Sequence, residues 1–183
     1  MLKKGSATLA AKKGLCGLMI WSLVALHPGA QAQTAGGGTD YLGANLNWEM
    51  GAHAGNLLPN QIEGVTEIFR IWGLRAGRRT GRQSFMEVTA ARGGYEDVSW
   101  ADLSLSARMD VPLDSVVGLM YLGADAHYFK PLGEEKYKLY GGGHVGAGVL
   151  ALIGGLFWFR ADMKFNVHPG TSMHLNFGLS MRF

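Results

Sequence analysis

The C-terminal stretch SMHLNFGLSMRF, residues 172–183, decides the fold class of this chain. Every second residue from Met173 to Phe183 is apolar, and the residues between them are polar or small. A period of two describes a β-strand with one apolar and one polar face. The alternation runs to the aromatic last residue, so we expect a closing strand whose apolar face meets a nonpolar medium.

The same alternation recurs in eight segments that are separated by turn-forming residues. The clearest interior example is 101–111, where apolar residues alternate with Asp, Ser and Arg. Segment 66–77 is the least regular, because Phe69 suggests one register and Trp72 the other; this predicts a β-bulge near Gly73. The eight predicted strands span about 41–54, 66–77, 82–91, 101–111, 116–129, 137–152, 157–167 and 172–183.

The connections predict two different ends. Short turns at 78–81, 112–115 and 153–155 fall at one end, and an even number of strands brings both chain termini to that end. The other end carries the connections predicted at 55–65, 92–99, 130–136 and 168–171.

Hydrophobic residues make up 48% of the chain, yet residues 33–183 contain no apolar run of membrane-spanning length. Strands can satisfy all backbone groups in lipid only in a closed barrel. The predicted fold is therefore all-β: an eight-stranded antiparallel up-and-down transmembrane β-barrel. A helix over 145–159 is the rival interpretation, but that segment is short and glycine-rich, and Arg160 follows it at once.

The N-terminus predicts a secretory signal peptide over residues 1–32. Lysines precede the uncharged segment 14–26, and Ala30-Gln31-Ala32 fits the small-x-small cleavage rule. The domains are then 1–32 as signal peptide and 33–183 as β-barrel, with an uncleaved anchor as the alternative. The only cysteine, Cys16, lies in the signal, so residues 33–183 can form no disulfide.

Charge gives no support to nucleic-acid binding. The chain has 17 basic and 14 acidic residues, a net charge of +3. Four lysines and no acid lie in residues 1–32, so the remainder carries a net charge of −1.

With the apolar faces outward, polar residues fill the lumen. An eight-stranded barrel has an interior just wide enough for side chains, so acids and bases there predict a paired structural network. The predicted lumen residues are Asn45, Asn47, Glu49, His53, Glu87, Asp102, Arg108, Asp110, Asp125, His127, Arg160, Asp162, Lys164, His174, Asn176 and Arg182.

Two clusters suggest binding but have simpler explanations. His53, His127 and His174 point inward near one rim, with His168 in the loop beside them. They could hold Zn²⁺ or Cu²⁺, or titrate between pH 5 and 8. No two have a local metal-ligand spacing, so scattered polar rim residues are favoured and no metal or cofactor is expected. Four arginines surround the first short turn and could meet lipid phosphates or a partner, although a solvated turn is simpler: Arg75, Arg78, Arg79 and Arg82.

On its alternating closing strand and terminal Phe, the chain resembles the small bacterial outer-membrane β-barrels of the OmpA/OmpX type. The resemblance implies a Gram-negative outer-membrane location with both mature termini in the periplasm. It also implies contact with outer-membrane lipid and lipopolysaccharide, recognition by the barrel-insertion machinery, and a monomer. The implied C-terminal insertion signal comprises Phe177, Leu179, Met181 and Phe183.

The sequence favours a structural, envelope-integrity role over three alternatives: a narrow channel or small-solute conduit, a surface-binding barrel, and a lipid-modifying enzyme. A serine hydrolase needs a Ser–His pair oriented by an acid. The local candidates Ser172 and His174 have no obvious acid partner, and no G-x-S-x-G elbow occurs, so we expect no enzymatic activity.

Overall fold

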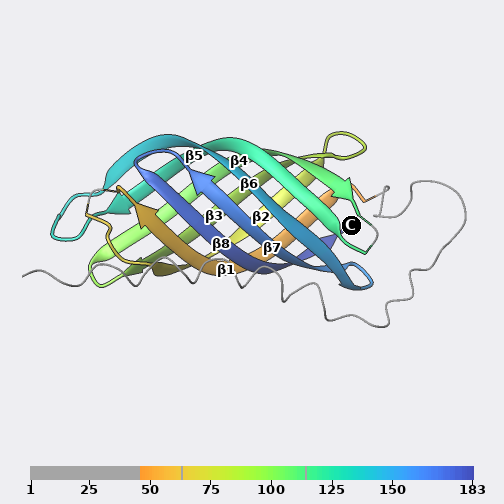
Figure 1. The fold of residues 1–183 in the computed structure, drawn as a ribbon, viewed down its shortest axis with the longest axis horizontal. Coiled ribbons are helices and arrows are strands. Elements are labelled where there is room, and N and C mark those ends of the chain that lie inside the picture. Colours follow the sequence, from red (N-terminus) through yellow and green to blue (C-terminus); the bar gives the residue numbers. More distant parts are fainter. Residues whose placement is uncertain (1–45, 63, 114) are drawn as a thin grey trace, which may run out of the picture. The chain divides into compact units, whose positions relative to one another are not determined.

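The computed structural model describes residues 46–62, 64–113 and 115–183. Eight strands form one closed barrel in which each strand pairs antiparallel with its sequence neighbours and β1 pairs with β8 (Figure 1). The strands are β1 (Trp48–Asn60), β2 (Phe69–Arg79), β3 (Ser84–Tyr95), β4 (Val98–Pro112), β5 (Val117–Lys130), β6 (Lys138–Gly154), β7 (Phe157–Asn166) and β8 (Thr171–Arg182). The predicted eight-stranded up-and-down barrel is confirmed.

The predicted signal peptide and the first residues of the predicted first strand lie outside the described residues. Across 46–62, 64–113 and 115–183, no helix is long and apolar enough to cross a membrane. The rival helix over 145–159 is not formed, because those residues belong to β6, a turn and β7.

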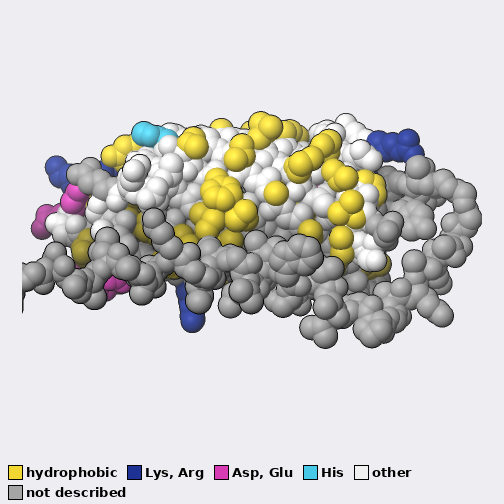
Figure 2. All heavy atoms as spheres, in the orientation of Figure 1, with side chains coloured by type: hydrophobic (Ala, Val, Ile, Leu, Met, Phe, Trp, Pro, Cys, Tyr) yellow, Lys and Arg dark blue, Asp and Glu magenta, His cyan; other side chains and the backbone are white. Residues whose placement is uncertain are grey.

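Side chains alternate between the lumen and the outer surface, because successive residues of a strand point to opposite faces. In β4, buried Asp102 and Arg108 alternate with exposed Leu103, Leu105 and Met109. Figure 2 shows hydrophobic side chains along the visible barrel wall and charged side chains at its two ends. This distribution of side chains is the one that a barrel in lipid requires.

The predicted bulge in β2 is wrong. Its pairing with residues 48–57 of β1 is continuous, and so is its pairing with β3. Phe69 and Ile71 point into the lumen and are buried. The mixed pattern of β2 arises because the lumen changes from polar to apolar along the strand while the register stays constant. Among the described strands, the register shifts between Leu152 and Gly154 in β6.

Three strands extend further than the sequence indicates. β1 continues to Asn60, where a loop was predicted from residue 55. β3 and β4 stay paired up to Tyr95 and Val98, so the predicted loop 92–99 shrinks to the turn Glu96–Asp97. The glycines at 93 and 94 suggested a loop, but a residue without a side chain can still pair through its backbone.

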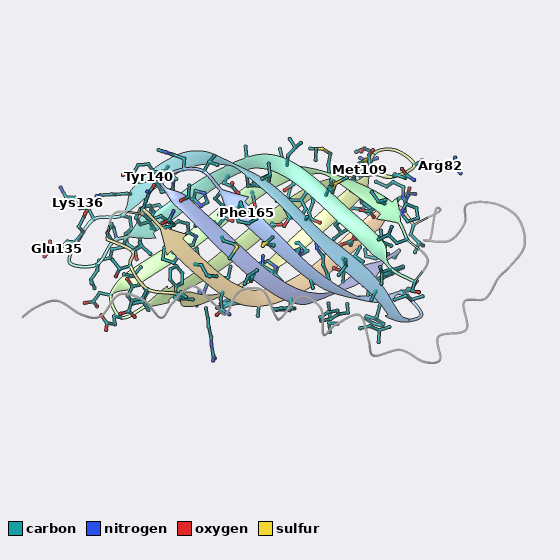
Figure 3. All side chains as sticks on the ribbon, viewed as in Figure 1. Arg82, Met109, Glu135, Lys136, Tyr140 and Phe165 are labelled. Carbon is teal, nitrogen blue, oxygen red and sulfur yellow. The ribbon has the colours of Figure 1, made fainter. Side chains whose placement is uncertain are left out.

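We name the two ends of the barrel by their connections. The turn end carries the connections at 80–83, 113–116 and 155–156, and the loop end carries those at 61–68, 96–97, 131–137 and 167–170. Figure 3 shows Arg82 at the turn end and Glu135 and Lys136 at the opposite end. The last residue, Phe183, exchanges backbone hydrogen bonds with Trp48 at the turn end, at 3.0 and 2.9 Å.

Candidate functional site in the barrel lumen

Arg108 anchors an ionic network inside the turn end. Its guanidinium donates hydrogen bonds to Glu49 (2.7 Å) and Asp110 (2.8 Å), and also to Glu87. The three carboxylates come from β1, β3 and β4, so one side chain ties three strands across the lumen. The planar fork of an arginine suits such multiple carboxylate contacts.

Two further arginines from the closing strands complete this network. Arg160 of β7 donates to Glu87 (2.6 Å) and Asp162 (2.7 Å). Arg182 of β8 donates to Glu49 (2.9 Å) and Asp110 (2.6 Å). All of these groups are buried, and each has an oppositely charged partner. Burial of a charge in a low dielectric requires such a partner.

Arg75 does not lie with the arginines of the first turn, where the sequence predicts it. It lies on the inward face of β2 and is buried. Its Nη1 donates to Asp162 at 2.7 Å, and Asn176 and the hydroxyl of Tyr121 approach the other oxygen of that carboxylate at 3.2 Å. The alternation with Trp72 and with Leu74, both exposed, carried the signal that places Arg75 inside.

The middle of the lumen contains a cation position that the protein itself fills. Among the described residues, Asp102, Asp125 and His127 are the group whose ligand atoms lie close enough to share a metal ion. The ammonium of Lys164 donates to Asp102 at 2.7 Å and to Asp125 at 3.0 Å, with Ser104 Oγ at 3.3 Å. An internal ammonium therefore neutralises the carboxylates that a divalent cation would need.

The four histidines considered as a rim cluster do not form one metal-capable group among the described residues. The ring of His127 is tilted by 45° against that of Trp100, with the centroids 5.0 Å apart, and His174 Nε2 lies 2.9 Å from the amide nitrogen of Asn166. His53 and His174 both line the small central cavity, whereas His168 is exposed in the last loop against Tyr140. His127 is the one histidine in the metal-capable group of the described residues.

A Ser–His–Asp arrangement that the sequence does not predict lies within the network. Ser106 Oγ lies 2.9 Å from Nε2 of His144, and Nδ1 of His144 lies 2.9 Å from Asp125. This connectivity is that of a serine-hydrolase triad. All three residues are buried, and Asp125 also accepts from Lys164. Glycines surround His144 in β6, so the sequence there has no clear alternation that would place His144 on the inward face.

An apolar layer closes the loop end of the lumen. Leu57, Phe69, Trp100 and Phe129 pack together inside the barrel, with the rings of Trp100 and Phe129 stacked 5.0 Å apart. The loop 61–68 folds into the same cluster through two buried side chains. Those two residues are Ile62 and Val65, which also pair with each other in an isolated β-bridge.

A second apolar cluster lies at the turn end, formed by Val117, Leu119, Leu150 and Trp158. The guanidinium of Arg182 lies over the ring of Trp158, so the ionic network borders this cluster. The polar network leaves a cavity of about 20 Å³, which has room for about one water molecule. The interior thus combines an apolar layer at the loop end, a polar network, and an apolar cluster on the β5–β7 side of the turn end. Sequence alternation alone gave only the polar part.

Most of the predicted lumen residues lie inside the barrel. Asn47 is exposed and precedes β1, and Asn45 lies outside the described residues. The buried ones are Glu49, His53, Glu87, Asp102, Arg108, Asp110, Asp125, His127, Arg160, Asp162, Lys164, His174, Asn176 and Arg182. The polar lumen residues that the sequence analysis left out are Arg75, Ser104, Ser106, Tyr121, His144, Asn166, Ser172 and Ser180. The residues from Arg75 to Ser180 in this second list all lie on inward-facing positions of their strands.

Comparison with known proteins identifies the fold. No protein-family model matches the chain, and no curated protein matches it. Neisserial surface protein A is similar in structure, with a TM-score of 0.65, 16% identity, and coverage of 74% of this chain and 97% of that chain.

Two proteins of Pseudomonas aeruginosa are similar as well. The N-terminal β-barrel domain of OprF has a TM-score of 0.57 and 10% identity, and covers 74% of this chain and 97% of its own. The outer membrane protein OprG has a TM-score of 0.56 and 9% identity, with coverage of 75% and 96%. These likenesses confirm the predicted resemblance to small outer-membrane barrels at the level of the fold.

Proposed function

We propose that this chain is an integral outer-membrane β-barrel protein whose solidly packed lumen serves a structural role in envelope integrity. Exposed apolar side chains along the strands, such as Leu103, Leu122 and Leu179, support a position across a bilayer. The likeness in fold to an outer membrane protein of Pseudomonas aeruginosa supports the outer membrane as that bilayer.

The observation that carries the structural role is that the lumen is filled in two ways, by the apolar layer at the loop end and by the ionic network. An ion crossing the barrel would have to pass the Trp100–Phe129 stack and then separate buried pairs such as Arg108 and Glu49. Removing one partner from such a pair costs several kcal/mol, on the order of 3–5. A permanently open channel through the barrel would require displacement of the aromatic stack together with separation of the ion pairs.

The other roles have less support. A surface-binding barrel needs a broad loop surface, whereas the connections Glu96–Asp97 and 167–170 are short. A hydrolase needs room for a substrate beside its nucleophile, and the cavity that Ser106 lines holds about one water molecule. We therefore propose a non-enzymatic, cofactor-free and monomeric barrel.

We further propose how the chain reaches the outer membrane and how it is oriented there. Residues 1–32 act as a cleaved signal peptide, and both mature termini face the periplasm. Phe177, Leu179, Met181 and Phe183 present the insertion signal to the barrel-insertion machinery; Phe177 and Leu179 are exposed on the outer face. The loop end then faces the outer leaflet and its lipopolysaccharide.

Two measurements test the proposed location and the closed lumen. Electrophoresis of the outer-membrane fraction with and without boiling should give a heat-dependent band shift, because a closed barrel resists SDS until heated. The purified protein in a planar bilayer should show no single-channel steps. Absence of the protein from the outer membrane would overturn the location, and steady ionic current would overturn the packed, structural lumen.

A further inference from the structure

A groove lies on the outer wall of the barrel near the loop end, across β2, β3, β4 and β5. It has a volume of about 620 Å³, which is ample for a small polar headgroup. One row of paired residues crosses it: Trp72 pairs with Arg92, Arg92 with Ala101, and Ala101 with Tyr128. The two large aromatic residues stand at the sides, and the small alanine leaves the middle open.

The next row toward the loop end is cationic at its sides. Arg70 is exposed on the outer face of β2, two residues beyond Trp72. Ser99 of β4 pairs with Lys130 of β5, which lies beside the groove and does not line it, and Gly94 of β3 pairs with Ser99. The groove therefore has small residues at its floor and positive side chains on the side toward the loop end.

The aromatic residues of the groove hold their neighbours in place. The guanidinium of Arg92 lies over the ring of Trp72, 4.5 Å from its centroid. Tyr128 stacks on Tyr137 with ring centroids 4.7 Å apart and an angle of 6° between the rings. Trp and Tyr side chains collect at the headgroup level of membranes, so these pairs indicate that the groove opens at the interface and not in the hydrocarbon.

Below the groove, toward the barrel middle, the outer wall is apolar. Leu74 pairs with Ala90, Ala90 with Leu103, and Leu103 with Ala126. This row lies two residues from the aromatic row, which corresponds to roughly 6–7 Å along the strands. An amphiphile with its anionic head in the groove would lay its chain along this row.

We propose that this groove binds the phosphorylated headgroup of a membrane lipid in the leaflet at the loop end. Arg70 and Arg92 contact the phosphate, and the acyl chain lies on Leu74, Ala90 and Leu103. Guanidinium groups suit phosphate because they offer several donors in one plane, and basic pockets on membrane proteins recognise anionic lipid heads. The inference rests on the proposed position of the barrel in a membrane.

The turn end supplies a matched control. There Arg78 lies over the ring of Trp48, 5.5 Å from its centroid, and the two residues are paired across β1 and β2. This pair has the same residue types and the same stacked arrangement as Arg92 and Trp72. Neither of its residues lines the groove. A substitution at Arg78 thus removes an outward arginine from an aromatic partner without touching the proposed site.

The test uses native mass spectrometry of protein purified from the membranes of expressing cells. The probes are diphosphoryl lipid A and the same lipid with both phosphates removed. Wild type and Arg78→Gln should bind the phosphorylated probe preferentially, and Arg70→Gln/Arg92→Gln should bind it about tenfold more weakly. Electrophoresis with and without boiling verifies that each variant is a closed barrel, and the single variant Arg70→Gln serves if the double variant is not.

Equal binding of the two probes by the wild type would overturn the proposal, and so would unchanged binding by the double variant. Loss of binding in Arg78→Gln would overturn it as well, since binding would then follow total charge and not the groove. Because the purified barrel is measured, these outcomes are independent of the conductance and location measurements. Ionic current would remove the structural role and leave the lipid site intact.

Discussion

The ring of Tyr121 on β5 lies directly over Gly146, its cross-strand partner on β6, where a Cβ atom would clash with the ring. Tyr121 reaches across β6 in this way to place its hydroxyl 3.2 Å from Asp162 on β7. The glycine therefore makes room for a side chain that joins the wall to the central network. The role of Gly146 is therefore steric. The absence of a side chain matters, since the backbone there is that of an ordinary extended strand.

Gly146→Ala should destabilise the barrel by about 1–3 kcal/mol, because the added methyl group would collide with the buried ring of Tyr121. Gly141→Ala is the control, since a Cβ atom at that glycine of the same strand meets nothing within 4 Å. Urea-induced unfolding in detergent, followed by tryptophan fluorescence, measures the difference. Equal midpoints for the two variants would contradict the steric role of Gly146. Adding Tyr121→Leu should lower the cost of Gly146→Ala.

The Ser106–His144 pair should be chemically inert despite its triad-like geometry. A fluorophosphonate probe should not label Ser106 in the folded barrel, because the adjoining cavity of about 20 Å³ cannot admit it. Ser106→Ala should instead cost about 1–3 kcal/mol of stability, since it leaves a buried imidazole nitrogen without its partner. Intact-mass measurement detects labelling, and a known serine hydrolase controls for probe activity. Covalent labelling of the native barrel at Ser106 would contradict the proposed non-enzymatic role.

Arg108→Met should be among the most destabilising substitutions in the chain. It removes the one arginine that pairs with all three of Glu49, Glu87 and Asp110, and breaking a buried ion pair from one side costs about 3–5 kcal/mol. Arg82→Met, at an exposed turn position, should change the free energy of unfolding by less than about 0.5 kcal/mol. Urea unfolding of both variants under the same conditions provides the comparison. A similar small effect for both would show that the network contributes little to stability.

Removing the internal ammonium should create a metal site that the wild type lacks. In Lys164→Ala, Asp102, Asp125 and His127 remain close enough to share an ion, and their carboxylates lose the cation between them. Refolding with Zn²⁺ should therefore raise the thermal stability of the variant, by mass action on the folded state, and leave the wild type unchanged. Refolding with Mg²⁺ is the control for general ionic effects, because histidine favours Zn²⁺. Equal stabilisation of both proteins by Zn²⁺ would contradict the role of Lys164.

The fold could be predicted from alternation because one face of each strand meets a nonpolar surrounding along its length. The lumen could be predicted only where its polarity stays constant. Phe69 and Ile71 looked like a register change because the lumen becomes apolar at the loop end, and sequence alone does not show that depth. His144 and Ser106 are 38 positions apart, and their contact depends on the β4–β5–β6 register. Cross-strand partners of this kind become visible only once the barrel is closed.

The closing strand allows folding and insertion to be separated in the last prediction. Phe183 is exposed on the outer face, and the backbone bonds that join it to Trp48 do not involve its ring. Phe183→Ala should therefore refold in detergent with the same heat-dependent band shift as the wild type. In cells, less of it should reach the outer membrane, because the barrel-insertion machinery is proposed to recognise the terminal aromatic ring.

Phe157→Ala is the control, because Phe157 is also an exposed aromatic residue at the turn end, where it begins β7. The ratio of the folded band in the outer-membrane fraction to total protein is compared for the two variants and the wild type. Equal ratios for all three would remove the insertion role of Phe183. Impaired refolding of Phe183→Ala in detergent would instead assign its ring to barrel stability, since no insertion machinery is present there.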